Sequence, residues 1–186
     1  MSFSRQLLAA TRLLVVMTVL LGVLYPAAVW AVGAVAVPGR AEGSLVTRDG
    51  EVVGSRLLGQ QVEDPALFHS RPSTNAYAGD SSGGSNLAAT APDQVSAVEE
   101  RRAAYATIAE GEPTADALTA SASGLDPHIS PEFARAQVAR VARENGLERS
   151  EVQRLVEQYT QDRDFGFLGE PRVNVLELNL ALTGMR

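Results

Sequence analysis

A long uncharged apolar run constrains this chain more than any other feature. Residues 13–37 read LLVVMTVLLGVLYPAAVWAVGAVAV. At ~1.5 Å rise per residue, a helix over this run exceeds the ~30 Å hydrocarbon core of a bilayer. The run therefore predicts a transmembrane helix. The alternative is a cleaved signal peptide ending near residues 34–36, which is disfavoured because such peptides have a much shorter apolar core.

The charges that flank this run predict its orientation. Arg5 and Arg12 precede it, whereas Arg40 beyond it is offset by Glu42. Because basic flanking residues stay on the cytoplasmic side of a membrane, residues 1–12 are expected in the cytoplasm. The chain is then a single-pass protein of the cell membrane, with transmembrane residues 13–37 and an extracytoplasmic accessory domain over residues 41–186.

Within the run, small residues and one proline indicate a membrane partner. Gly22 and Ala28 would let a second helix approach closely. Pro26 lacks a backbone donor and leaves a carbonyl that a neighbouring helix or side chain must satisfy. We therefore expect Gly22, Pro26 and Ala28 to face another subunit, while membrane lipid surrounds the rest of the helix.

Composition excludes several functions. The formal net charge is −6, and all 22 acidic residues follow the apolar run while two of the 16 basic ones precede it, which leaves −8 for the exported part. An acidic domain is unsuited to nucleic acid, so no nucleic-acid partner is expected. The chain has no cysteine. Every basic residue is arginine, so neither a P-loop nor lysine chemistry is available.

The exported part reads as one α+β domain with a short β-hairpin and about four helices. Residues 44–47 and 51–58 are strand-like and flank an Asp49–Gly50 turn, a strong hairpin signal. Residues 70–91 are rich in Ser, Gly, Pro and Asn and predict a long loop without regular structure.

The helices are predicted from caps and apolar spacing. Helix signals cover residues 92–109 after a Thr90 and Asp93 capping box, 131–145 between Ser130 and Gly146, and the stretch around Val152, Leu155, Val156 and Tyr159. The segment 173–182 is ambiguous. Asn174 and Glu177 favour a capped helix there, although a strand buried on both faces would look similar.

Residues with catalytic chemistry are few. His69 and His128, with Asp126 and the serines of residues 81–85, could form a hydrolytic triad, but no G-x-S-x-G turn exposes a nucleophile. A two-histidine metal site with Asp126 is open for the same residues, although the usual ligand spacing is absent. We expect no catalytic residue and no metal site.

Two motifs remain. In the segment 82–86, SGGSN, consecutive backbone N–H groups could converge on an anion, although glycine-rich loops more often only turn. The segment 126–131, DPHISP, combines Asp and Pro turn residues ahead of a helix cap, so Asp126 and His128 are expected to hold local geometry.

Taken in order, these motifs resemble those of one family. The sequences FHSRPS at 68–73, SGGSNL at 82–87, TASASGLDPHISP at 119–131, QVARVA at 137–142 and RVNVLELNLAL at 172–182 resemble the small C subunit of the bacterial Kdp-type potassium-transporting P-type ATPase. LLGQ at 57–60 also looks like an element of that family. The resemblance covers nearly the whole chain, including the apolar run.

The resemblance implies an accessory subunit without its own catalysis. Its partners would be a channel-like potassium-translocating subunit, a P-type ATP-hydrolysing subunit and a small single-pass subunit. The family is described as needed for assembly and as raising the ATP affinity of the hydrolysing subunit, with the glutamine that matches Gln60 invoked in ATP contact. Our predicted topology places Gln60 across the bilayer from cytoplasmic ATP, so we expect coupling through the complex and no tightly bound cofactor.

Direct ATP contact stays open as one alternative, and a membrane-anchored extracytoplasmic enzyme as another. The candidates for partner docking or nucleotide contact are Gln60, His69, Arg71, Ser82, Gly83, Gly84, Ser85, Asn86, Asp126 and His128.

Overall fold

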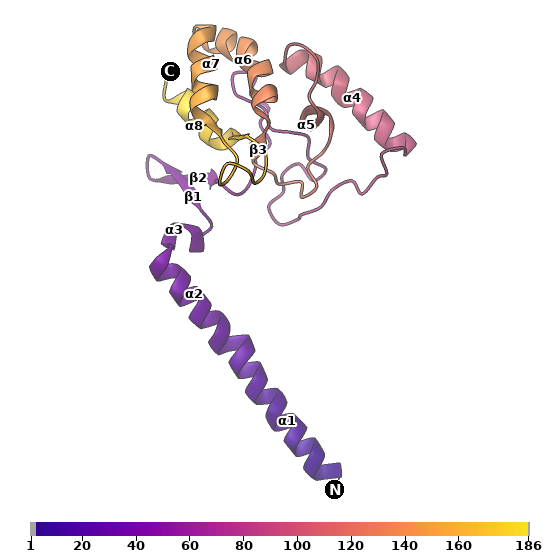
Figure 1. Ribbon diagram of the computed structural model, residues 1–186, viewed down its shortest axis with the longest axis vertical. Coiled ribbons are helices and arrows are strands. Elements are labelled where there is room, and N and C mark those ends of the chain that lie inside the picture. Colours follow the sequence, from indigo (N-terminus) through magenta and orange to yellow (C-terminus); the bar gives the residue numbers. More distant parts are fainter. Residues whose placement is uncertain (1–2, 186) are drawn as a thin grey trace. The chain divides into compact units, whose positions relative to one another are not determined.

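The computed structural model describes residues 3–185 and has the predicted α+β composition (Figure 1). The chain divides into two compact units, one up to Leu45 and one from Val46 onward. The first unit is helical, and the second holds the sheets and the remaining helices.

The first unit is dominated by one continuous helical stretch. It comprises α1 (Phe3–Val19), a π-helical turn η1 (Leu20–Leu24) and α2 (Tyr25–Ala36), followed by the short α3 (Pro38–Ala41). An 18-residue window within residues 3–36 has a mean hydropathy of 2.4, and none of these residues is buried. This helix is long and apolar enough to cross a membrane. It begins earlier than the predicted run because the residues ahead of Leu13 are good helix formers.

The π-helical turn explains how the helix tolerates its proline. Pro26 lies in the first turn of α2, directly after η1, and the Tyr25 N–H bonds to the Leu20 carbonyl five residues back. A locally widened turn of this kind provides partners for backbone groups that a proline would otherwise leave unpaired. The π-helical turn therefore adjusts the helix locally at Pro26, and the contact of Pro26 with another subunit stays a prediction.

The predicted hairpin is confirmed. β1 (Leu45–Arg48) and β2 (Glu51–Ser55) form a two-stranded sheet. Both turn residues are left-handed, with φ of 53° at Asp49 and 85° at Gly50. This conformation matches the twist of the flanking strands and is the reason that Asp-Gly marks such turns.

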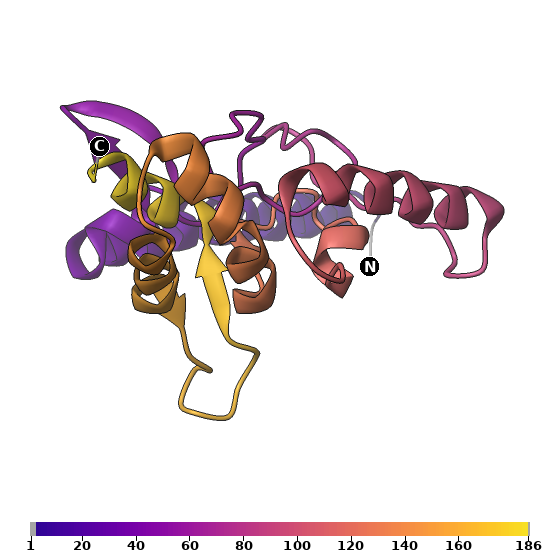
Figure 2. The same ribbon diagram turned by 90° about the horizontal axis from the view of Figure 1, so that it is seen from above.

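The second unit places helices around a small antiparallel sheet. Its elements are α4 (Pro92–Ile108), α5 (Ala115–Leu118), β3 (His128–Ile129), α6 (Pro131–Asn145), α7 (Arg149–Tyr159), β4 (Thr160–Gln161), β5 (Arg172–Asn174) and α8 (Val175–Thr183). The strands are ordered β3-β5-β4, with His128 opposite Asn174 and Thr160 opposite Val173. Figures 1 and 2 show α6, α7 and α8 grouped about this sheet, with α4 to one side.

The core follows the predicted helix faces. Ala134, Val138, Val141 and Ala142 of α6 are all buried, as are Val152, Leu155 and Val156 of α7. The Ser130 hydroxyl accepts from the Phe133 N–H at 3.1 Å, and Gly146 ends α6 in a left-handed conformation. A serine cap ahead of proline and a glycine at the far end are the signals from which this helix was predicted.

Two expected capping boxes are incomplete. α4 has Ala91 as its N-cap, without a side-chain bond, so the predicted Thr90 cap is wrong. Pro92 fixes the start of the helix, which leaves Thr90 one residue too early. The segment after residue 174 is helical, and the Asn174 side chain accepts from the Glu177 N–H. Glu177 itself forms an ion pair with Arg56 at 2.8 Å.

The irregular segment 65–69, which buries Phe68 in the core, is held by side chains rather than by a neighbouring strand. Asn179 on α8 accepts from the Phe68 N–H at 2.8 Å and donates to its carbonyl at 2.9 Å. Gln137 on α6 accepts from the His69 N–H at 2.7 Å and donates to its carbonyl at 3.1 Å. We call this pair of contacts the amide clamp.

The rest of the segment is bonded in the same way. Arg140 donates to the carbonyls of Pro65 and Leu67, and Asn145 donates to the Ala66 carbonyl at 2.7 Å. Backbone N–H and carbonyl groups inside a protein need hydrogen-bond partners. Here polar side chains provide the bonds that a neighbouring strand would provide in a sheet.

Replacing one half of the amide clamp tests this arrangement. In Gln137→Leu, the half-buried His69 N–H and carbonyl both lose their partner, and we expect the free energy of unfolding to fall by about 1–3 kcal/mol. The matched control is Gln158→Leu on the exposed face of α7, with an expected change within about 0.5 kcal/mol. Thermal unfolding of the full chain in detergent, followed by circular dichroism, measures both. Equal melting of the two variants would contradict the clamp.

Candidate functional site

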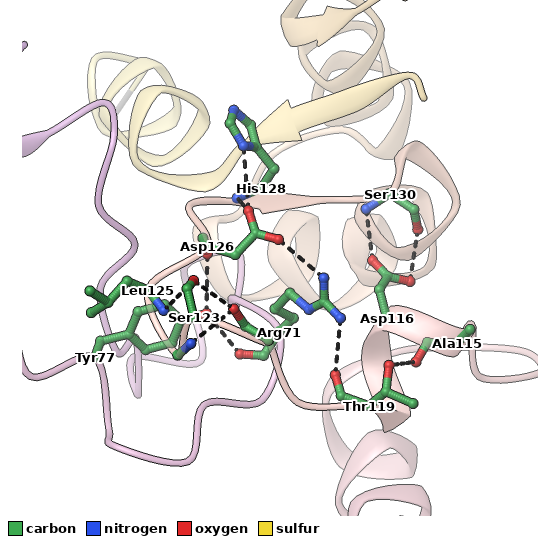
Figure 3. A network of polar contacts seen from close by, with 12 residues as sticks. Arg71, Tyr77, Ala115, Asp116, Thr119, Ser123, Leu125, Asp126, His128 and Ser130 are labelled. Atoms are coloured by element: carbon green, nitrogen blue, oxygen red, sulfur yellow. Dashed lines mark hydrogen bonds and ion pairs between the residues drawn. The ribbon is translucent and has the colours of Figure 1, made fainter. Parts of the chain in front are cut away.

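The candidate residues near the start of β3 form a charged network around Asp126 (Figure 3). Arg71 donates through Nη1 to Asp126 Oδ2 at 3.1 Å and through Nη2 to the Thr119 carbonyl at 3.3 Å. Asp126 Oδ1 accepts from the His128 N–H at 3.0 Å, and His128 Nδ1 lies 3.5 Å from the same oxygen. The carboxylate thus joins the loop that carries Arg71 to the strand that carries His128.

The surroundings of Asp126 keep it ionised. Burial raises the pKa of this carboxyl, but the hydrogen bonds from His128 and Arg71 outweigh that effect, and the pKa lies below its ordinary value. Because both carboxylate oxygens of Asp126 already accept hydrogen bonds, its role is structural, and it is not free to act as an acid or a base. The turn role predicted for residues 126–128 agrees with this geometry.

Tyr77 also links the loop that carries Arg71 to the segment that carries Asp126. Its hydroxyl donates to the Arg71 carbonyl at 2.9 Å and lies 3.4 Å from the Asp126 carbonyl. Burial raises the pKa of Tyr77 to about 12, so the hydroxyl remains a donor. A Cβ at Gly59 would collide with the Tyr77 ring and the Asp126 carbonyl, which explains the glycine in the LLGQ motif. Tyr77 was not among the predicted site residues, and its signal in the sequence is a lone aromatic in a Ser/Gly-rich loop.

The glycine-rich loop packs against residues 121–124. The Gly83 N–H donates to the Ser123 carbonyl at 2.8 Å, and the Ser82 hydroxyl donates to the same oxygen at 3.1 Å. A Cβ on Gly84 would lie 3.0 Å from the Ala122 carbonyl oxygen. Gly84 therefore permits close contact between two backbones, and the N–H of Gly83 is already used within the fold.

The end of this loop is turned outward. Ser85 accepts a hydrogen bond from the Leu87 N–H at 3.4 Å. Asn86 is exposed, with a left-handed φ of 54°. Among residues 3–185, its side chain has no partner in the hydrogen bonds that the structure records. Ser85 and Asn86 are thus the part of this motif that a partner could reach.

Gln60 lies apart from the Asp126 network. Its Nε2 donates to the Val53 carbonyl at 2.8 Å, and its own carbonyl accepts from the Ser70 hydroxyl at 2.9 Å. It lines a cavity of about 200 Å³ together with apolar side chains of α8 such as Leu176 and Leu180. The described residues around this cavity include no arginine to meet a phosphate.

The two histidines have separate surroundings. His69 Nε2 lies 3.1 Å from the Asp64 carbonyl, and its backbone is part of the amide clamp, whereas His128 pairs with Asp126. Over residues 3–185 the structure brings together no group of three His, Cys, Asp or Glu side chains suited to a metal. Neither histidine is bonded to a serine of residues 81–85 among the recorded hydrogen bonds of this range.

A cleft of about 510 Å³ separates the segment 69–77 from α4. Arg71, Tyr77, Arg101 and Tyr105 contribute to its walls. The Tyr105 and Phe133 rings stack with centroids 6.0 Å apart, and Tyr105 is the buried residue of α4. Ile108 also packs against the core, and Arg101 donates to the Leu118 carbonyl at 3.0 Å, so α4 is attached along one side.

Several polar residues that hold these loops in place were not among the predicted site residues. Asp116 accepts from the Ser130 N–H at 2.7 Å and from its hydroxyl at 3.0 Å, which fixes the start of α6 beside the network. Gln137 and Arg140 occupy the buried face of α6. Gln137 lies three residues after Ala134 and four before Val141, and Arg140 lies three residues after Gln137. This helical spacing was the available signal.

His69 makes folding stability sensitive to mild acid. Burial and then the charge of Arg140 lower its pKa from the ordinary 6.5, so the folded chain holds the ring neutral while the unfolded chain takes up a proton. The stability that the neutral His69 ring contributes to the folded chain is present above about pH 6.5 and declines as the pH falls below that value. We expect a lower melting temperature at about pH 5.5 than at 7.5.

The variant His69→Gln should reduce this difference, while His128→Gln should retain it. Asp126 does not contribute here, because its lowered pKa affects stability only near and below its ordinary 3.8. Thermal melting of the full chain at both pH values makes the comparison. An undiminished difference in His69→Gln would refute the assignment.

Known proteins resemble this chain over almost its whole length. The family model described as "K+-transporting ATPase, c chain" matches residues 7–184. A potassium-transporting ATPase KdpC subunit of Kineococcus radiotolerans is 53% identical, covering 96% of this chain and 93% of the relative. The subunit of the same name from Sorangium cellulosum is 52% identical, covering 95% and 96%.

The KdpC subunit of Koribacter versatilis is 45% identical and covers 97% of this chain and 95% of its own. These matches confirm the resemblance that the ordered motifs predicted. The chain belongs to the KdpC family, the c chains of K⁺-transporting ATPases.

Proposed function

We propose that this chain is a non-catalytic accessory subunit of an ATP-driven potassium uptake complex. Residues 13–37 anchor it in the membrane, and an extracytoplasmic domain over residues 41–186 docks on partner membrane subunits to assemble and stabilise the complex. The observation that carries the proposal is the cross-braced loop surface around Asp126. Beside it, the glycine-rich loop is bonded to Ser123 and presents Asn86 to solvent with a left-handed backbone. Prearranged groups lose little conformational freedom on binding.

The partners are those that the family resemblance implies. They are a channel-like potassium-translocating subunit, a P-type ATP-hydrolysing subunit and a small single-pass subunit. The curated relatives are named as subunits of a potassium-transporting ATPase, which supports partnership in such a complex. The unburied helix over residues 3–36 offers one contact surface, on which Gly22 and Ala28 permit close approach.

An effect on ATP affinity is proposed as coupling between sites. If an extracytoplasmic domain stabilises one access state of the complex, the hydrolysing subunit binds ATP with the affinity of that state. Two observations favour coupling over direct ATP contact by Gln60. Its side-chain amide is bonded to the Val53 carbonyl, and the cavity beside it is lined largely by apolar groups.

The competing class, an anchored enzyme, has less support. The acidic and imidazole groups that could transfer protons are engaged in local structure: Asp126 with Arg71 and His128, and His69 beside the amide clamp. A general base must reach a substrate proton, and these groups are committed to the backbone and to each other.

Two substitutions separate docking from local bracing. Asn86→Gly removes an exposed side chain and keeps the left-handed backbone that glycine adopts freely. We expect recovery of partner subunits to fall by about three- to tenfold, the effect of one lost interfacial hydrogen bond, with unchanged melting. Asp126→Ala leaves Arg71 unpaired, so we expect a loss of about 2–3 kcal/mol in folding stability as well.

The measurement is affinity purification of the complete complex through a tagged partner subunit, with melting of each variant chain in parallel. The matched control is Asp49→Gly, which replaces another exposed left-handed residue, on the hairpin turn. The docking proposal fails if Asn86→Gly assembles like the unaltered chain and if Asp126→Ala loses assembly only in proportion to its loss of thermal stability. The loops would then only brace the domain.

A further inference from the structure

The loop over residues 162–170, which joins β4 to β5, exposes the most prominent apolar side chains of the second unit. Phe165 is 88% exposed, Phe167 71% and Leu168 49%. In Figure 2 the loop projects away from the helices beyond the small sheet. We call it the aromatic loop. A soluble surface scatters single apolar residues, but two exposed phenylalanines beside a leucine form a patch.

The aromatic loop is held by a β-bridge and by two ion pairs. Asp164 and Leu168 form an antiparallel bridge, in which each N–H bonds to the other carbonyl at 2.9 Å. Arg163 pairs with Glu170 at 2.5 Å, and Arg172 pairs with Asp164 at 3.1 Å. These contacts present both aromatic rings from a closed turn.

The turn also holds a bulky residue in an unfavourable conformation. Phe165 has a left-handed φ of 54° and is followed by Gly166 at 81°. A large non-glycine side chain in this region raises the energy of the folded state. Because the Phe165 ring is 88% exposed, packing within the domain does little to offset this energy. Packing within the described residues therefore does not account for this conformation of Phe165.

We propose that the aromatic loop is the docking tip of the domain, with Phe165 and Phe167 inserted into an apolar pocket on the extracytoplasmic surface of a partner membrane subunit. This inference rests on the proposed function and names the surface through which it acts. Interfaces are dominated by a few aromatic anchors enclosed by a polar rim that excludes water, and the loop has this composition.

The charges at the base of the loop identify the occupant as protein. The carboxylates of Asp162, Asp164 and Glu170 outnumber the guanidinium groups of Arg163 and Arg172. An anionic lipid surface attracts basic loops, and this excess of acid is repelled by it. A second copy of this chain would bring two acidic domains together. Within residues 3–185, Asp162 has no recorded ion-pair partner, so the pocket is expected to carry a basic group at its rim.

The first experiment measures assembly. Phe165→Ser with Phe167→Ser, in the full chain, should lower recovery with a tagged partner subunit by about tenfold or more, because anchor residues contribute most of the binding energy. The matched control is Val52→Ser with Val95→Ser, which alters two other exposed apolar residues, 59% and 52% exposed. Its recovery should stay within about twofold, the range of near-neutral surface contacts.

The second experiment identifies the occupant. A photoreactive phenylalanine analogue, benzoylphenylalanine, at position 167 of the complete complex should cross-link to a partner subunit. Cross-linking only to lipid, only to a second copy of this chain, or to nothing would overturn the proposal.

Failure here is distinguishable from failure of the proposed function. If the double serine variant assembles normally while Asn86→Gly does not, the domain docks but not through the aromatic loop. If the unaltered chain is not recovered with partner subunits at all, the proposed function itself fails.

Discussion

The structure depends on two buried amides that take the place of a β-strand. Gln137 and Asn179 each bond both backbone groups of one residue in the irregular segment 65–69, His69 and Phe68 respectively. Without them, the two buried backbone groups of Phe68 would have no partner, at a cost of about 1–3 kcal/mol each, and the two half-buried groups of His69 would lose theirs as well. The three-stranded sheet is too short to provide these bonds, because β3 and β4 contain two residues each.

The candidate surface follows directly from this clamp. Phe68 and His69 are fixed against α8 and α6, and Arg71 comes two residues later, within reach of Asp126. Tyr77 then returns to the Arg71 carbonyl, and the glycine-rich loop lies along residues 121–124. Segments with little regular structure thus become a fixed platform, since each successive loop is bonded to one already held.

The sequence predicted the parts of the fold whose cause is local. The Asp49–Gly50 turn, the Ser130 cap and the Gly146 end of α6 depend on residues within a few positions of one another. The π-helical turn before Pro26 and the absence of a Thr90 cap were missed because they depend on small competing adjustments of the backbone.

The candidate site was only partly predictable. Its residues were identified from ordered motifs, but Gln137 and Asn179 bond to backbone groups 68 and 111 positions away, and no short pattern reports such pairs. The aromatic loop escaped attention because Phe165 and Phe167 resemble ordinary core residues in sequence. Their exposure becomes evident only in the folded chain.

The central claim is that the second unit works outside the membrane as a docking domain. Single cysteines at Ser85 and Ser150 test it directly, because the chain contains no other cysteine. With the chain expressed alone in intact cells, an impermeant thiol reagent should label both positions, and partner subunits should then protect Ser85. Labelling of the lone chain only after lysis would contradict the topology, and equal labelling of Ser85 with and without partners would contradict docking through its loop.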